Sequence, residues 1–450
     1  MKACLVAPVL GFVLLVALAS LGWFHTSIAP DTASYLAAAR AADPLGVSRL
    51  PLYGWAAGWM LAHAPALLAW VQAAIFLGGA ALMIASLQRF GLSRAAAASL
   101  GIAIGGSTML LLWARDAVPE VAGHGFLFMG FGAAVMAADG ALLWVLPAGL
   151  AVTLAWALRP SLLAFAVLLA GVPLLLPRST SARRSARALL LLVAILAPAV
   201  GLSAWRAVRE GSAMVVSFGG FQMSGMAALM LTPRIAATLP PAMRPTAAAI
   251  LATRARLERT GTAIAVPVNS HGVRSFPSAA ALYFDLLART HDAVLYGAVL
   301  PLRGASESWP HFDARMERFT LAVLLRAPVD YAAWVLGGLA RAVGHALVLN
   351  PVLVAASLLL LLIGVWRALG AAPPYGAGLL PAGDRARDWA ILLPVIGLYT
   401  LGTLAPIVLV TFPAGRYIDS ADLMLAAVPI LGVMRLWPRR DGRGARTRQR

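Results

Sequence analysis

The chain has 450 residues, of which 61% are hydrophobic and 12% are charged, and its mean hydropathy is +0.82. A soluble protein of this length needs more charge to cover its surface, so the composition excludes an ordinary soluble domain. The net charge of +18 would suit a nucleic-acid-binding protein, but the basic residues gather in short connections and in the tail 438–450. This distribution excludes that class and is typical of loops beside anionic lipid. The single cysteine, Cys4, excludes an internal disulfide framework.

Long apolar runs predict about ten transmembrane helices. Roughly 20 apolar residues in a helix cross the hydrocarbon core of a bilayer. The first run could be a signal peptide, but it is long for one, and we expect an uncleaved helix. The predicted spans are 5–24, 66–88, 95–113, 121–138, 141–158, 161–177, 188–206, 350–366, 389–411 and 421–437.

Charged residues predict the orientation of these spans. Lys2 places the N-terminus in the cytoplasm, and alternation then puts arginine-rich connections such as 89–94 on the same side, as the positive-inside rule requires. The segment 328–349 is apolar but contains Asp330 and His345, so we predict an amphipathic helix lying at the membrane interface.

The predicted organisation follows from these spans. We expect a transmembrane module of about seven spans (1–206), a large external segment that includes the interfacial helix (207–349), a second transmembrane module of about three spans (350–437) and a basic cytoplasmic tail (438–450).

Ionisable residues at the external ends of the spans are candidates for function, because a charge near hydrocarbon is costly to place. They occur in four short motifs on the same predicted side of the membrane. These are Asp31 in PDTASYL, Arg115, Asp116 and Glu120 in WARDAVPEV, Arg159 in ALRPSLL, and Arg416 with Tyr417 in FPAGRYIDS.

Each candidate also has a purely structural interpretation. Asp31 follows a proline and precedes a helical pattern, so it could cap a helix, and Glu120 could be an acid at a helix start. Arg159 and Arg416 could simply extend toward lipid headgroups. Arg115 could form a local ion pair with the aspartate that follows it.

Taken together, the candidates indicate a site for a lipid-linked phosphate. Arginines bind phosphate through charge-assisted hydrogen bonds, and a carboxylate can deprotonate an acceptor hydroxyl. Carboxylates can also hold a divalent cation such as Mg²⁺ or Mn²⁺ against a phosphate.

The order of these motifs resembles the GT-C glycosyltransferases, such as the protein O-mannosyltransferase and aminoarabinose transferase group. PDTASYL and SRLPLYG follow the first span, RDAVPE and LRPSLL come next, and GRYIDSADLML precedes the last span. The resemblance covers roughly 1–210 and 350–437. It implies a GT-C-like fold and an inverting transfer of a sugar from a polyprenyl-phosphate donor to a hydroxyl of a glycan, glycolipid or protein. The expected location is the periplasmic face of a bacterial inner membrane.

The resemblance also implies residue roles. Asp31 matches the family's essential carboxylate, which acts as general base or metal ligand, and Asp116 or Glu120 would be the second acid, with Glu120 preferred because it borders a span. Asp31 and Glu120 would hold a divalent cation if one is used, although Asp31 lacks the adjacent acid that many members carry. The residues expected to bind the donor phosphate are Arg159, Arg416, Tyr417 and Arg115.

Two other functions stay open. External histidines at 271, 291 and 311 would suit a lipid-linked saccharide polymerase or ligase. A transporter or flippase of an anionic or lipid-linked solute would use the same basic residues as a path. The sequence shows no internal repeat of the kind found in many transporters, which disfavours transport.

Overall fold

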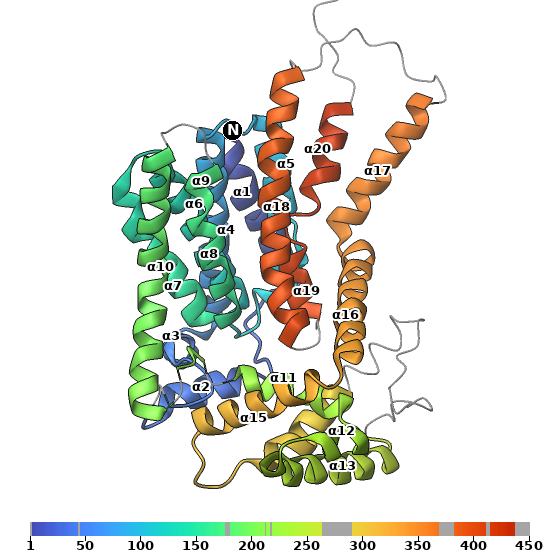
Figure 1. The fold of residues 1–450 in the computed structure, drawn as a ribbon. Helices are drawn as coiled ribbons and strands as arrows, with labels where there is room; N and C mark the ends of the chain where they lie inside the picture. Colours follow the sequence, from blue (N-terminus) through green and yellow to red (C-terminus); the bar gives the residue numbers. More distant parts are fainter. Residues whose placement is uncertain are drawn as a thin grey trace, which may run out of the picture.

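The computed structural model is a bundle of long helices with a layer of shorter helices at one end (Figure 1). The structure describes residues 2–43, 46–175, 181–211, 213–216, 218–262, 290–368, 382–410 and 415–436. Within these ranges every regular element is a helix, and the one β-type contact is an isolated bridge between Ser27 and Asp116.

The bundle contains the apolar helices. They are α1 (Val6–Ser20), α4 (Pro65–Arg89), α5 (Arg94–Gly105), α6 (Glu120–Ala138), α7 (Val145–Leu158), α8 (Phe165–Ala170), α9 (Val172–Leu175), α10 (Ser181–Glu210), α16 (Pro328–Leu349), α17 (Pro351–Ala368), α18 (Ala382–Val410) and α20 (Ala427–Leu436). The short helix α19 (Gly415–Ala421) precedes α20.

The layer lies at the end of the bundle opposite the N-terminus (Figure 1). Its helices are α2 (Thr32–Arg40), α3 (Leu52–His63), α11 (Gly219–Met230), α12 (Pro233–Thr238), α13 (Arg244–Arg259) and α15 (Trp309–Leu324). Phe221, Phe312 and Phe319 are buried in a separate apolar core of this layer.

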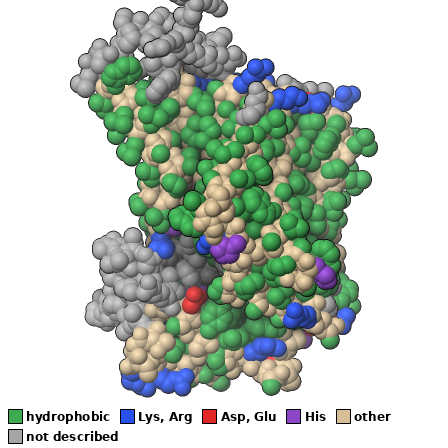
Figure 2. Space-filling model, turned by 180° about the vertical axis from the view of Figure 1, so that it is seen from behind, with side chains coloured by type: hydrophobic (Ala, Val, Ile, Leu, Met, Phe, Trp, Pro, Cys, Tyr) green, Lys and Arg blue, Asp and Glu red, His purple; other side chains and the backbone are tan. Residues whose placement is uncertain are grey.

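The bundle has the surface of a membrane-spanning protein. Large apolar side chains point outward along it, and Phe12, Val193 and Leu362 are each more than half exposed. Figure 2 shows hydrophobic side chains over the middle of one face, with most Lys and Arg side chains toward its two ends. A surface that faces water rarely carries so many large apolar side chains, whereas a surface that faces the hydrocarbon region of a membrane favours them. The chain is therefore an all-helical, multi-pass membrane protein, as the sequence predicts.

Each of the ten predicted spans corresponds to an apolar helix of the described structure. Six of them are long enough to cross a membrane, and the other four are shorter apolar helices, Leu142–Leu158, Pro160–Leu174, Pro351–Trp366 and Ala427–Leu436. The predicted module boundaries are not tested by these helices and stay a prediction. The predicted tail 438–450 lies outside the described residues.

The segment 328–349, for which we expected an interfacial helix, forms α16. This helix is also long and apolar enough to cross a membrane, so its interfacial position stays a prediction. It packs against α18 and α19 and leads into α17 in the same direction (Figure 1). The polar residues that suggested an interface face the protein, since His345 contacts Asp419 and Asp330 is only 4% exposed. α16 and α17 run in the same direction (Figure 1). If they cross the membrane once together, the predicted sides of the later connections stay the same.

Candidate active site

The first part of the candidate site is an ion pair between Asp31 and Arg49. Asp31 directly precedes α2, but its side chain accepts no capping hydrogen bond there. Its Oδ1 instead lies 3.7 Å from Nη2 of Arg49. Arg49 also donates a hydrogen bond of 2.9 Å to the Tyr35 hydroxyl and lies over the rings of Tyr35 and Phe218. Asp31 thus faces a guanidinium that aromatic rings hold in place.

The second part is an ion pair between Glu120 and Arg159. Glu120 is the first residue of α6, and Arg159 lies in the turn between α7 and η4 (Pro160–Ala164). Both side chains are buried, and Nη1 of Arg159 lies 3.7 Å from Oε1 of Glu120. The guanidinium also lies 4.9 Å from the ring centre of Tyr417 on α19. Because Arg159 is buried beside an acid, it does not extend to the headgroups as the structural alternative would require.

Tyr35 connects the two ion pairs. Burial raises the pKa of its phenol well above the ordinary value, and the charge of Arg49 opposes this shift. The charges of Glu120 and Asp31 raise the same pKa further. Tyr35 also packs in one buried apolar cluster with Ala122, two residues after Glu120, and Leu158, next to Arg159. Both ion pairs therefore lie around the same packed residues, and we call them the carboxylate–arginine cluster.

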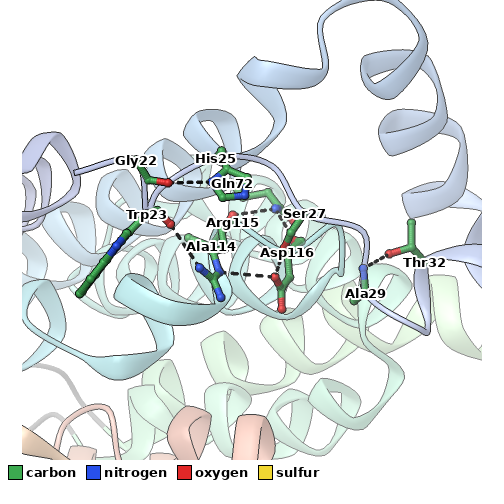
Figure 3. A network of polar contacts seen from close by, with 10 residues as sticks. All are labelled: Gly22, Trp23, His25, Ser27, Ala29, Thr32, Gln72, Ala114, Arg115 and Asp116. Carbon is green, nitrogen blue, oxygen red and sulfur yellow. Dashed lines mark hydrogen bonds and ion pairs between the residues drawn. The ribbon is translucent and has the colours of Figure 1, made fainter. Parts of the chain in front are cut away.

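Asp116 and Arg115 lie instead in a contact between two loops (Figure 3). The Ser27 hydroxyl donates a hydrogen bond to the Asp116 carboxylate, and Nε of Arg115 lies 3.8 Å from Oδ1 of Asp116. Nη1 of Arg115 donates to the carbonyl of Trp23 at 3.2 Å. These are the contacts expected from a local ion pair.

The same loop contact positions the carboxylate–arginine cluster. The backbone N–H of Ser27 donates to the carbonyl of Arg115, and the Thr32 hydroxyl donates to the carbonyl of Ala117 at 2.8 Å. Thr32 follows Asp31 directly, and Ala117 precedes Glu120 by three residues. The hydrogen bonds therefore fix the two candidate acids relative to each other.

A separate set of contacts holds α19. Asp419 accepts a hydrogen bond of 2.7 Å from Nε1 of Trp113 and lies 2.8 Å from Nε2 of His345. Trp113 ends η2 (Met109–Trp113) and His345 belongs to α16, so these contacts join three distant segments. Tyr417 is two residues from Asp419 and is held in place beside Arg159 by them.

The structure thus brings four predicted site residues into one cluster and places two elsewhere. Asp31, Glu120, Arg159 and Tyr417 come together, whereas Asp116 and Arg115 make the loop contact. Arg416 is part of α19, but its side chain lies outside the described residues. The catalytic and binding roles of all seven stay predictions.

Arg49 and Tyr35 were not among the site residues predicted from the sequence. Arg49 lies within the SRLPLYG motif, next to the predicted acid-bearing loop, and Tyr35 follows Asp31 by four residues. Residues four apart share one face of a helix, so this spacing was the available signal for Tyr35. The partners of Arg49 depend on how its loop folds back over α2, which no local pattern indicates.

The carboxylate–arginine cluster does not by itself fit a resident divalent cation. Asp31 and Glu120 each face a guanidinium, as ion pairs rather than as a set of oxygens around one point. Among the residues that the structure describes, no three His, Cys, Asp or Glu side chains lie close enough together to hold a metal. A cation would need ligands from a substrate phosphate as well.

No protein-family model matches the chain. No curated protein matches it. Among solved structures, it is similar to crystal structures of ArnT from Cupriavidus metallidurans, one in the apo state and one bound to undecaprenyl phosphate. The TM-scores are 0.33 and 0.34, the identities 15% and 16%, and each match covers 94% of this chain and 77% of the other. At these values the likeness assigns neither a family nor an activity to the chain.

Proposed function

We propose that the chain is an inverting glycosyltransferase that moves a sugar from a polyprenyl-phosphate donor to a hydroxyl acceptor. The observation that supports this function is the carboxylate–arginine cluster at one end of an apolar bundle. A lipid-linked phosphate could reach guanidinium groups there while its isoprenoid chain stays in the hydrocarbon region.

Arg159 is the group that we assign to the donor phosphate. Its Nη1 is buried and makes no hydrogen bond within the described part of the chain, and the ion pair with Glu120 is longer than a direct hydrogen bond. A phosphate oxygen would accept a charge-assisted hydrogen bond from this donor. We also assign Tyr417 and Arg416, both on α19, to the donor phosphate. Arg115 has the least support among the predicted phosphate contacts, because its guanidinium already donates a hydrogen bond in the loop contact.

Asp31 is the proposed general base. It would take the proton of the acceptor hydroxyl while that oxygen attacks the anomeric carbon, and the bond from this carbon to the phosphate oxygen would break on the opposite face. The leaving phosphate gains negative charge, which Arg159 would stabilise. The Arg49 guanidinium, 3.7 Å from the Asp31 carboxylate, would hold this carboxylate in position.

Glu120 is the proposed second acid in preference to Asp116. The Glu120 carboxylate faces Arg159 within the cluster, whereas the Asp116 carboxylate is hydrogen-bonded to Ser27. Glu120 would fix the orientation of the Arg159 guanidinium. Binding of Mg²⁺ or Mn²⁺ by Asp31 and Glu120 stays a prediction, and the proposed steps do not depend on it.

We place the site on the external face of a bacterial inner membrane. The cluster lies at the end of the bundle opposite the N-terminus, and the positive-inside rule predicts that the N-terminal end is cytoplasmic. The acceptor hydroxyl, from a glycan, glycolipid or protein, would approach from the layer that includes α11 and α15.

The histidines that would suit a polymerase or ligase do not form a site among the described residues. His291 is fully buried and its ring packs against Trp334, while His311 contacts the Ser308 hydroxyl. His271 lies outside the described residues. No specific contact among the described residues favours this second function.

The test is sugar transfer in reconstituted membranes from a labelled polyprenyl-phosphate sugar. If Asp31 is the base, Asp31→Asn lowers kcat about 10²–10⁴-fold, the usual contribution of general base catalysis. Release of the lipid phosphate should fall in parallel with sugar transfer. Addition of EDTA in the same assay tests whether transfer depends on the predicted divalent cation.

Asp43→Asn is the matched control. Asp43 lies just after α2, as Asp31 lies just before it, and also pairs with an arginine, Arg209, at 3.4 Å, but it does not belong to the cluster. Its replacement should leave turnover unchanged. Full activity of Asp31→Asn would remove Asp31 from catalysis, and the absence of phosphate release with every donor tried would refute the transferase.

A further inference from the structure

A pocket lies outside the carboxylate–arginine cluster and shares no residue with it. It has a volume of about 630 Å³ and forms where α12, the end of α15 and the start of α16 meet. This volume is within the range of small-molecule sites. Its walls include Thr232, Arg234, Thr238, Arg326, Val329 and Asp330.

Two exposed arginines give the pocket an anion-binding side. Arg326 donates from Nε and Nη2 to the hydroxyl and carbonyl of Thr238, each at 3.1 Å, and from Nη1 to the carbonyl of Ala322 at 2.8 Å. A guanidinium has five N–H groups, so two remain for a ligand after its position has been fixed. Arg234 lines the same pocket from α12 and is exposed.

An exposed apolar stripe starts at this pocket and follows α16. Val329, Leu336, Val343 and Leu347 are 69%, 66%, 56% and 59% exposed. Their spacing of seven, seven and four residues places them on one face of the helix. Leu325, which precedes α16 and also lines the pocket, is 79% exposed. The arginines therefore mark the polar end of a surface that is otherwise suited to hydrocarbon.

We propose that this pocket binds the headgroup of a phospholipid, with the phosphate on Arg234 and Arg326 and an acyl chain along the stripe of α16. Charged hydrogen bonds to phosphate and apolar contact with a chain are the two interactions that these surfaces offer side by side. Free phosphate would use the arginines but would leave the stripe unused, so a lipid should bind more tightly than its soluble headgroup.

The test is native mass spectrometry of the full chain in detergent, titrated with phosphatidylglycerol, phosphatidylethanolamine or glycerol phosphate. We expect a discrete phospholipid adduct with either lipid and no adduct at the same concentration of glycerol phosphate. The double variant Arg234→Gln/Arg326→Gln should bind phospholipid at least about tenfold more weakly, and Val329→Asn/Leu336→Asn should also weaken it.

Arg259→Gln, an exposed arginine of α13 outside the pocket, is the matched control and should bind as the parent chain does. Since Arg326 also holds Thr238, the double variant could lose its fold. In that case Arg234→Gln alone decides, and it should weaken binding severalfold. Unchanged phospholipid binding by the arginine variants would overturn the site. Equal binding of glycerol phosphate would overturn its assignment to a lipid.

Discussion

At the scale of single residues, the buried pair of Glu120 and Arg159 is the least expected feature of this chain. Their side chains are 5% and 8% exposed. Desolvation of two charges costs several kcal/mol, and their attraction repays it only with very good geometry. The ion-pair distance of 3.7 Å is not the geometry of a strong hydrogen bond. We infer that this ion pair contributes to ligand binding rather than to the stability of the fold.

This inference predicts a non-additive effect on stability. Glu120→Gln leaves the charge of Arg159 buried without its acid and should cost a few kcal/mol. Glu120→Gln/Arg159→Gln removes both charges and should be more stable than the single variant. Thermal unfolding in detergent measures both. Asp139→Asn, which breaks the exposed pair with Arg89, should cost less than about 1 kcal/mol. Simple additivity of the two buried replacements would contradict the inference.

Asp313 in α15 gives a pH-dependent prediction outside the membrane bundle. Burial raises the pKa of this carboxyl from 3.8 to about 6, although the backbone N–H of Phe221 donates to it at 2.7 Å. Because the folded state binds the proton more tightly, the resulting stability is present below pH 4 and is lost as the pH rises through 6. The loss is on the order of 3 kcal/mol.

Asp313→Asn tests this effect, because an amide keeps the acceptor oxygen and does not titrate. Melting temperatures of both chains should be measured from pH 4 to pH 8. Relative to the asparagine variant, the parent chain should become less stable across this range. A constant difference between the two would show that Asp313 titrates at its ordinary pKa.

At the scale of elements, α4 and α6 approach each other closely because both present glycines. A Cβ atom at Gly79 would lie 2.1 Å from the carbonyl oxygen of Gly125, and a Cβ at Gly125 would lie 2.7 Å from the backbone of Phe76. Small residues of this kind permit close packing of membrane helices. Glu120 begins α6, so this packing also sets the position of the candidate second acid.

We therefore predict that Gly125→Ala separates α4 from α6 and destabilises the chain by about 1–3 kcal/mol, the usual cost of overpacking. Gly201→Ala on α10 is the matched control, because a Cβ there meets nothing within 4 Å. Alanine is the better helix former, so the control should be neutral or stabilising. Thermal unfolding compares the two, and equal effects would refute the close packing.

At the scale of the whole molecule, composition predicts a bundle of membrane helices but not which residues of different helices and loops contact each other. The spans follow from apolar runs that lipid requires, so they could be located without the structure. The partner of His345 is 74 residues away, and Asp116 is separated from Ser27 by 89. Contacts at such distances come from packing, so no local pattern could predict that His345 of α16 contacts Asp419. The sequence could not show the different contacts of Asp116 and Glu120 either, because their partners, Ser27 and Arg159, are far away in the chain.

The arrangement of α16 and α17 leads to the last prediction. If the two helices together cross the membrane once, the residues before α16 and those at the start of α18 lie on opposite sides. Cys4 is the only cysteine, so Cys4→Ala gives a background for single-cysteine labelling. On this background we choose Ser306→Cys and Ala386→Cys, because both positions are exposed.

An impermeant thiol reagent added to intact cells should label Ser306→Cys, because we place this end of the bundle outside. It should label Ala386→Cys only after the membrane is opened. Asp43→Cys and Asp139→Cys, at opposite ends of the bundle, calibrate the two sides. If both 306 and 386 react from outside, α16 and α17 each cross the membrane. The C-terminal basic tail would then be external, which the positive-inside rule disfavours. If only 386 is labelled from outside, the orientation of the bundle is the reverse of the predicted one, and the carboxylate–arginine cluster lies on the cytoplasmic side.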